Sequence, residues 1–150
     1  MITDNGNIQI RELVDYLCSA LDLTKKEIAR LIGVCESSIQ KNMKEDLLSM
    51  AKKKTGKRIG VFVLVTAELR AKGFTKDAIY NGLHEPSVHN LALGRDESVV
   101  QVLQGGRDVD PMLLASLAEK GVEKYLRKVA FDETAMRDRV TSIIRESLSI

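Results

Sequence analysis

The ten residues TKKEIARLIG, from Thr24 to Gly33, constrain the fold of this chain more than any other stretch. Thr24 stands three residues before Glu27, the spacing of a capping box, in which a hydroxyl and a carboxylate satisfy free amides at a helix start. Apolar residues follow with the spacing of a buried helix face: Ile28, Ala29 and Ile32. Gly33 is the expected left-handed residue that ends the helix. The stretch therefore predicts a helix over residues 25–32.

Helices are also predicted on both sides of this stretch. Upstream, apolar residues spaced by three and four predict an amphipathic helix over residues 10–21. Downstream, a helix from Glu36 to Met43 would turn Ile39 inward and expose its opposite face. That exposed face would consist of Ser37, Gln40, Lys41 and Lys44.

The remainder of the chain has one ambiguous segment, residues 59–69, IGVFVLVTAEL. A run rich in β-branched residues suits either a buried strand or a helix buried on all sides. No partner strand is evident nearby, so we predict a helix ending at Gly73, while a strand over residues 59–66 would indicate a winged variant. Further helices are predicted over residues 76–83, 87–93 and 97–104, from Pro111 after the cap Asp110, and over residues 132–148.

Composition agrees with a helical protein, because aromatic residues make up only 4% of the chain and there are two prolines. We expect an all-α fold of one or more small helical bundles with one or two helix-turn-helix motifs. The expected organisation is an N-terminal domain (1–50), a basic linker (51–58), a second helical domain (59–130) and a C-terminal amphipathic helix (131–150). The net charge of +2 indicates no partner by itself, but positive charge is concentrated around the linker.

A short repeated sequence pattern, here called the sequence echo, predicts that the same structural motif occurs twice in the chain. GVCESSIQ, residues 33–40, and GRDESVVQ, residues 94–101, share a glycine, a branched apolar residue six positions later and a glutamine after it. If Gly94 ended one helix and Asp96 capped the next, residues 97–104 would repeat the geometry of residues 36–43.

The segment LTKKEIARLIGVCESSIQKNM resembles the helix-turn-helix of bacterial and phage repressors, with Ala29, Gly33 and Ile39 at the positions that hold its two helices together. Residues 69–121 resemble a lambda-repressor-like (Xre-type) domain over a longer span. The resemblance implies that a recognition helix enters the major groove of DNA. The implied DNA-binding residues are Ser37, Ser38, Gln40, Lys41 and Lys44 in the first copy, and Arg95, Glu97, Ser98 and Gln101 in the second.

These features predict a transcriptional regulator of the phage or prophage repressor type, which binds double-stranded DNA. We expect it to be a homodimer whose subunits associate through the terminal helix. Five basic residues would contact phosphates: Lys52, Lys53, Lys54, Lys57 and Arg58. Two alternatives stay open. LHEPSVHNLALG is similar to the Asn-Pro and Ala-Leu-Gly segment of the toxin-binding domain of Xre-type antitoxins, and short helix-turn-helix segments also occur in helical adaptors that bind only protein.

Other classes of function find little support in the sequence. There is no phosphate-binding glycine loop and no nucleophile motif, so we expect neither an enzyme nor a cofactor. His84 and His89 have no cysteine nearby, which argues against a metal site. The longest apolar run is seven residues, too short for a membrane span. Two cysteines and no signal-peptide pattern at the start lead us to expect a reduced, cytoplasmic protein.

Overall fold

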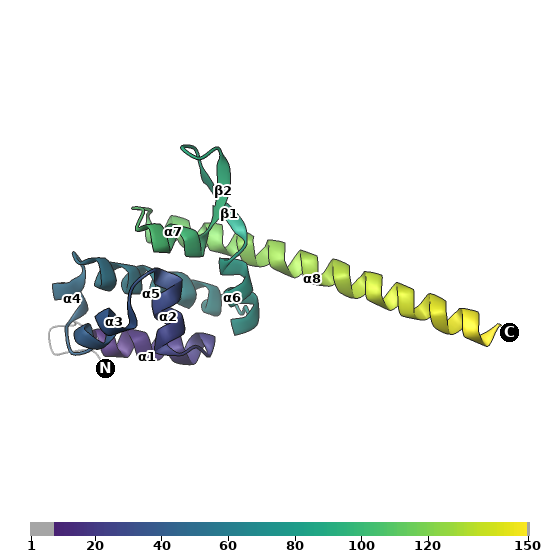
Figure 1. Ribbon diagram of the computed structural model, residues 1–150, viewed down its shortest axis with the longest axis horizontal. Helices are drawn as coiled ribbons and strands as arrows, with labels where there is room; N and C mark the ends of the chain where they lie inside the picture. The colour runs from purple at the N-terminus through teal and green to yellow at the C-terminus, as the bar shows by residue number, and fades with distance from the viewer. Residues whose placement is uncertain (1–7, 150) are drawn as a thin grey trace.

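A computed structural model describes residues 8–149, so residues 1–7 of the expected N-terminal domain and residue 150 of the expected terminal helix lie outside it. The described part is predominantly helical, as predicted, with one β-hairpin as the exception to an all-α fold (Figure 1). Its elements are α1 (Ile10–Leu21), α2 (Lys25–Ile32), α3 (Glu36–Asn42), α4 (Leu47–Met50), α5 (Lys54–Ala71), α6 (Lys76–Leu83), β1 (Pro86–Asn90), β2 (Arg95–Ser98), α7 (Val99–Gly105) and α8 (Pro111–Leu148).

The centre of the molecule is α5, which contacts α1, α2, α3, α4, α6 and α8. Its apolar side chains face several neighbours at once, and Ile59, Phe62 and Val65 are fully buried. The prediction of a helix over residues 59–69 is confirmed, but the helix is not buried on all sides, because Leu64 is 48% exposed. The helix begins earlier than expected: residues 54–58, predicted to belong to a linker, form its first turns.

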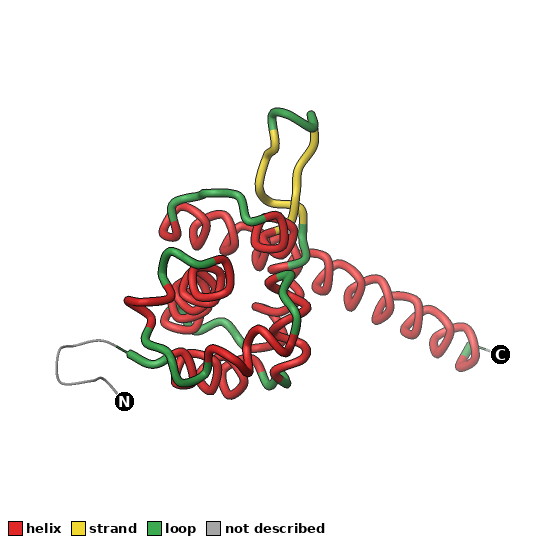
Figure 2. The backbone as a smooth tube through the Cα atoms, turned by 60° about the vertical axis from the view of Figure 1, so that its left-hand side comes forward, coloured by secondary structure: helices red, strands yellow, loops and turns green. Residues whose placement is uncertain are grey.

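The segment between α6 and α7 corrects two predictions. Residues 87–93, expected to be helical, belong to a hairpin in which β1 pairs antiparallel with β2, His89 opposite Asp96. Gly94 has a φ of 64° in the hairpin turn and so does not end a helix. The next helix begins at Val99 rather than at residue 97, because Ser98 and not Asp96 caps it. The hairpin projects from the helical body (Figure 2).

The last helix, α8, has two parts with different surroundings. Its first half packs against α5 and α6, and buries Leu114, Ala118 and Val122. Gly121 does not end it; a Cβ there would lie 2.5 Å from the Gly82 carbonyl oxygen of α6, so the two helices approach closely. The second half, residues 130–148, extends away from the body (Figure 1) and is here named the α8 tail. It contains the predicted helix 132–148.

The buried residues form one cluster that runs from Ile10 of α1 to Val122 of α8. In the part of the chain that the structure describes, no helix has both the length and the hydropathy that a membrane span requires.

Candidate nucleic-acid interface

The unit formed by α2 and α3 has the local bonds that the sequence predicts. The Thr24 hydroxyl accepts a hydrogen bond of 3.2 Å from the Glu27 amide. In return, the Thr24 amide donates a hydrogen bond of 3.1 Å to Glu27 Oε1, which completes the capping box. Gly33 follows α2 with a φ of 73°, and the next amide, of Val34, donates to the Ala29 carbonyl at 3.0 Å. The capping box fixes the start of α2, and the geometry at Gly33 and Val34 fixes the direction in which the chain leaves α2 toward α3.

The position of α3 is set by its apolar face. Ile39 is fully buried and Met43, just after the helix, is nearly so. Asn42 turns its side-chain amide back onto the helix, donating to the Ser38 carbonyl at 2.6 Å. The opposite face is therefore held outward, with exposed Ser37, Gln40 and Lys41. Ser38 is half-buried and lies at the edge of this face.

Three of the predicted DNA-binding residues lie beside two basic residues that were not predicted from the sequence. Gln40, Lys41 and Lys44 line one open hollow of about 510 Å³ together with Arg11 of α1 and Lys25 of α2. Four cations thus line the same hollow as the glutamine, and Asp15 is the acidic residue of this lining. Arg11 and Lys25 lie on the polar faces of their helices near the helix starts, but only the packing of α1 and α2 brings them beside α3. We name these five residues the α3 basic face.

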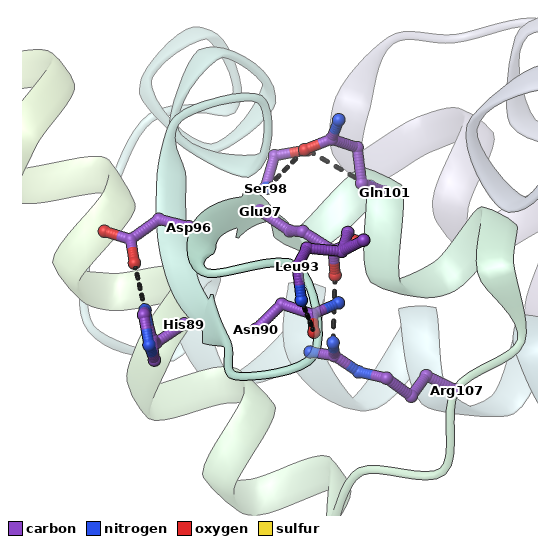
Figure 3. A network of polar contacts seen from close by, with 8 residues as sticks. All are labelled: His89, Asn90, Leu93, Asp96, Glu97, Ser98, Gln101 and Arg107. Carbon is purple, nitrogen blue, oxygen red and sulfur yellow. Dashed lines mark hydrogen bonds and ion pairs between the residues drawn. The ribbon is translucent and has the colours of Figure 1, made fainter.

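The second predicted DNA-binding motif, around residues 94–104, has a different structure from the first, and Figure 3 shows its contacts. Ser98 is buried, and it shares a capping box with Gln101: the Ser98 amide donates to Gln101 Oε1 at 2.8 Å, and the Gln101 amide donates to Ser98 Oγ at 3.1 Å. Glu97 forms an ion pair with Arg107 at 3.0 Å. Three of its four predicted residues thus hold the hairpin and α7 in place, and Arg95 is left exposed on β2.

The five residues predicted to contact phosphates lie in different surroundings and do not form one surface. Lys57 pairs with Asp108. Arg58 Nη1 donates to the carbonyls of Ile32 at 2.8 Å and Gly33 at 3.2 Å, so this side chain caps the end of α2. Lys52, Lys53 and Lys54 are exposed around the start of α5. Lys54, Lys57 and Arg58 line a cavity beside α7 rather than the hollow next to α3.

The two thiols differ in exposure. Cys35, the N-cap residue of α3, is exposed and makes no side-chain capping bond. Cys18 of α1 is half-buried, and burial raises the pKa of its thiol, with nearby Asp15 adding to the increase. Within residues 8–149, no group of three or more His, Cys, Asp or Glu side chains could hold a metal ion. The His84 Nδ1 atom lies 2.8 Å from the Tyr80 carbonyl, and His89 pairs with Asp96.

The geometry of the α3 basic face suits an extended polyanion. An α-helix with its side chains is about 10–12 Å across and fits a DNA major groove about 12 Å wide. Cations on flanking helices can then reach the backbone phosphates on either side. Comparison of this chain with protein-family models, with curated proteins and with solved structures finds no match.

Proposed function

We propose that this protein is a sequence-specific DNA-binding transcriptional regulator of the phage or prophage repressor type, and that α2 and α3 form its helix-turn-helix. The observation that carries the proposal is the α3 basic face, in which Gln40 projects from a helix of fixed position among four cations. The single acidic residue in this lining, Asp15, leaves the surface net positive, as binding to a phosphate backbone requires.

Each side chain has a distinct role in this proposal. Gln40 reads a base edge, because a glutamine amide can bond bidentately to adenine. Lys41, one position further, reads guanine or neutralises a phosphate. Arg11, Lys25 and Lys44 contact phosphates on both sides of the groove and thereby set the register of α3. Ser37 lies in the first turn of α3, where side chains of a recognition helix reach the bases.

The α8 tail supports a homodimer as the binding unit. The helix face that is buried on the body continues along the tail as an apolar stripe, with Met136 61% and Ile143 57% exposed. From Leu126 and Val129 the stripe continues along the tail to Met136, Val140 and Ile143, with steps of three and four residues that two associating helices use, and Glu133 occupies the one position between Val129 and Met136. Residues 131–148 hold three arginines and four acidic residues, so two tails meet without a large charge repulsion.

The dimer is tested by sedimentation equilibrium of the full chain. We expect Ile143→Glu, which places a carboxylate in the stripe, to yield monomers at concentrations where the wild type is dimeric. Ser142→Glu adds the same charge on the opposite face of the exposed tail and should remain dimeric. If both variants and the wild type have the same mass distribution, the stripe does not mediate association.

DNA binding is tested by selecting bound sequences from a random pool and measuring affinity for the selected site against salt concentration. Gln40→Ala should cost about 1–3 kcal/mol, and Lys44→Ala should reduce the salt slope by about 1. Gln101→Ala is the matched control, because Gln101 is an exposed glutamine that caps α7. The proposal fails if no sequence is enriched, or if Gln101→Ala weakens binding as much as Gln40→Ala does.

A second candidate, an Xre-type antitoxin with a toxin-binding domain, is favoured by one observation. The antitoxin-like segment LHEPSVHNLALG, residues 83–94, contains β1 and the turn of the projecting hairpin, whose tip exposes 88% of Leu91 and 53% of Leu93. Two uncovered leucines on a protruding turn are suited to an apolar pocket on a partner protein. If a toxin-like reading frame adjoins the gene, co-expression should neutralise its product, and Leu91→Ser with Leu93→Ser should abolish that effect without changing the selected DNA site. Neutralisation by the double variant would reject the hairpin as the contact.

A further inference from the structure

A cavity of about 150 Å³ lies between α5, α7 and the start of α8, apart from the α3 basic face. Its walls are apolar side chains: Val61, Val102, Leu103, Val109 and Leu114. Four cationic side chains also line it: Lys54, Lys57, Arg58 and Arg107. Neither the proposed DNA reading by α3 nor the proposed dimerisation through the α8 tail uses this cavity.

Size and charge define the ligand that this cavity suits. An apolar cavity of about 150 Å³ is large enough for benzene. Asp108 and Glu97 pair with Lys57 and Arg107, so two acidic partners face four cations. The remaining positive charge comes from Lys54, which is exposed, and Arg58, whose bonds go to backbone carbonyls. A compact apolar group that carries one carboxylate would fill the cavity and offset this charge.

Arg58 connects the cavity to the α2–α3 unit. Its Nη1 atom donates to the carbonyls of Ile32 and Gly33, where the chain turns toward α3. A Cβ on Gly106, at the end of α7, would collide with Nη2 of the same guanidinium, so Arg58 is enclosed between the ends of α2 and α7. A second link between the two helices is the Gln104 amide, which donates to the Arg30 carbonyl at 3.0 Å. A change at Arg58 therefore reaches the turn before α3.

We propose that this cavity binds a small organic monocarboxylate with an apolar body about the size of a benzene ring, and that the ligand stabilises the α2–α3 turn through Arg58. A guanidinium has five N–H donors, so a carboxylate can bond to Nη2 and Nε while Nη1 keeps the α2 carbonyls. The ligand thereby restricts the motion of Arg58 and of the turn that it caps. This coupling also predicts that the ligand tightens DNA binding, a prediction that rests on the proposed function.

Ligand binding is measured on the full chain by fluorine NMR, with 4-fluorophenylacetate as the probe and the neutral 4-fluorophenylacetamide as its matched control. The carboxylate should bind and the amide should bind much more weakly. Lys54→Gln should weaken carboxylate binding by up to about fivefold, the value of one exposed ion pair, whereas Lys52→Gln, two residues away and outside the cavity lining, should not. Val109→Phe, at a half-buried position of the wall, should block binding.

The site is rejected if the folded protein does not bind the probe, if acid and amide bind alike, or if Val109→Phe leaves binding unchanged in a protein whose circular dichroism matches the wild type. The coupling has a readout that needs no DNA: the backbone amide resonances of Gly33 and Val34 should shift on addition of 4-fluorophenylacetate, and an unchanged turn rejects it. With the selected DNA site, the probe should raise affinity by about fivefold, the lower end of typical coupling. Unchanged or lower affinity also rejects the coupling, while failure to select any DNA rejects only the proposed function, because the fluorine and amide readouts remain.

Discussion

The two glycines of the sequence echo, Gly33 and Gly94, provide a sharp test of how the α2–α3 unit is held. Both have a left-handed backbone, with φ values of 73° and 64°. Their surroundings differ: a Cβ on Gly33 would lie 2.9 Å from the Gln104 Cα of α7 and 3.2 Å from Arg58 Nη1, whereas a Cβ on Gly94 would meet nothing within 4 Å. Replacing each by alanine therefore separates backbone strain from a packing clash.

The expected losses follow from these two contributions. An alanine in the left-handed region costs about 1–2 kcal/mol, and both variants carry this cost. Gly33→Ala also forces a methyl group against the Cα and Cβ atoms of Gln104 in α7, and overpacking of this kind costs about 1–3 kcal/mol more. We expect the free energy of unfolding to fall by about 1–2 kcal/mol in Gly94→Ala and by about 2–5 kcal/mol in Gly33→Ala.

Urea unfolding followed by circular dichroism measures both losses, provided that the slope against denaturant stays the same. A difference between the two variants of less than about 0.5 kcal/mol would refute the reasoning, because it would mean that α7 does not pack against the α2–α3 turn as closely as the Gly33 geometry requires. A larger loss in Gly94→Ala would refute it as well.

Two further predictions concern the start of α2 and the thiols. Thr24→Ala removes the hydroxyl of the capping box and should lower the free energy of unfolding by about 0.5–2 kcal/mol in the same assay; no loss would mean that the box does not hold α2. Cys35 should react quickly with a maleimide at pH 7 and be protected by the selected DNA, whereas Cys18 should react slowly until the pH rises, because burial raises the pKa of its thiol and the thiolate is the reactive form. Mass spectrometry of the labelled peptides distinguishes the two sites, and fast labelling of Cys18 or unprotected Cys35 would contradict this.

Features that depend on neighbouring residues were predictable from the sequence. The capping box at Thr24, the left-handed Gly33 and the Asp110–Pro111 start of α8 all involve residues within about four positions of each other, and the structure has each of them. The helical character of residues 59–69 was also predictable, because no partner strand was evident nearby, but the exposure of Leu64 on this helix was not.

The hairpin was not predictable in this way. Its residues carry the spacing of a glycine turn followed by a helix cap, and only the pairing of β1 with β2 and the contacts of β1 with α8 decide against a helix. Within the turn, the Asn90 side chain accepts the Leu93 amide at 3.2 Å, a bond that an asparagine can form in a turn as readily as near a helix. The similarity between the sequences at Gly33 and Gly94 therefore reflects the same turn chemistry in two different local structures, a helix end and a hairpin turn.

The candidate site was predictable only in part, for a similar reason. Gln40, Lys41 and Lys44 follow from the helical period of α3, but Arg11 and Lys25 join them through the packing of three helices. In the second motif, Gln101 has the sequence position of Gln40 but accepts a bond from the Ser98 amide, because its helix begins two residues later than predicted.

The central claim is that α3 reads base edges through Gln40, and base-by-base discrimination tests it most directly. Affinities of the wild type and of Gln40→Ala are measured for the selected DNA site and for every single-base change in it, at one salt concentration. We predict that Gln40→Ala loses about 1–3 kcal/mol of discrimination at one or two neighbouring base pairs and keeps the wild-type preference elsewhere. Equal weakening at all positions, or an unchanged preference at every position, would contradict the claim.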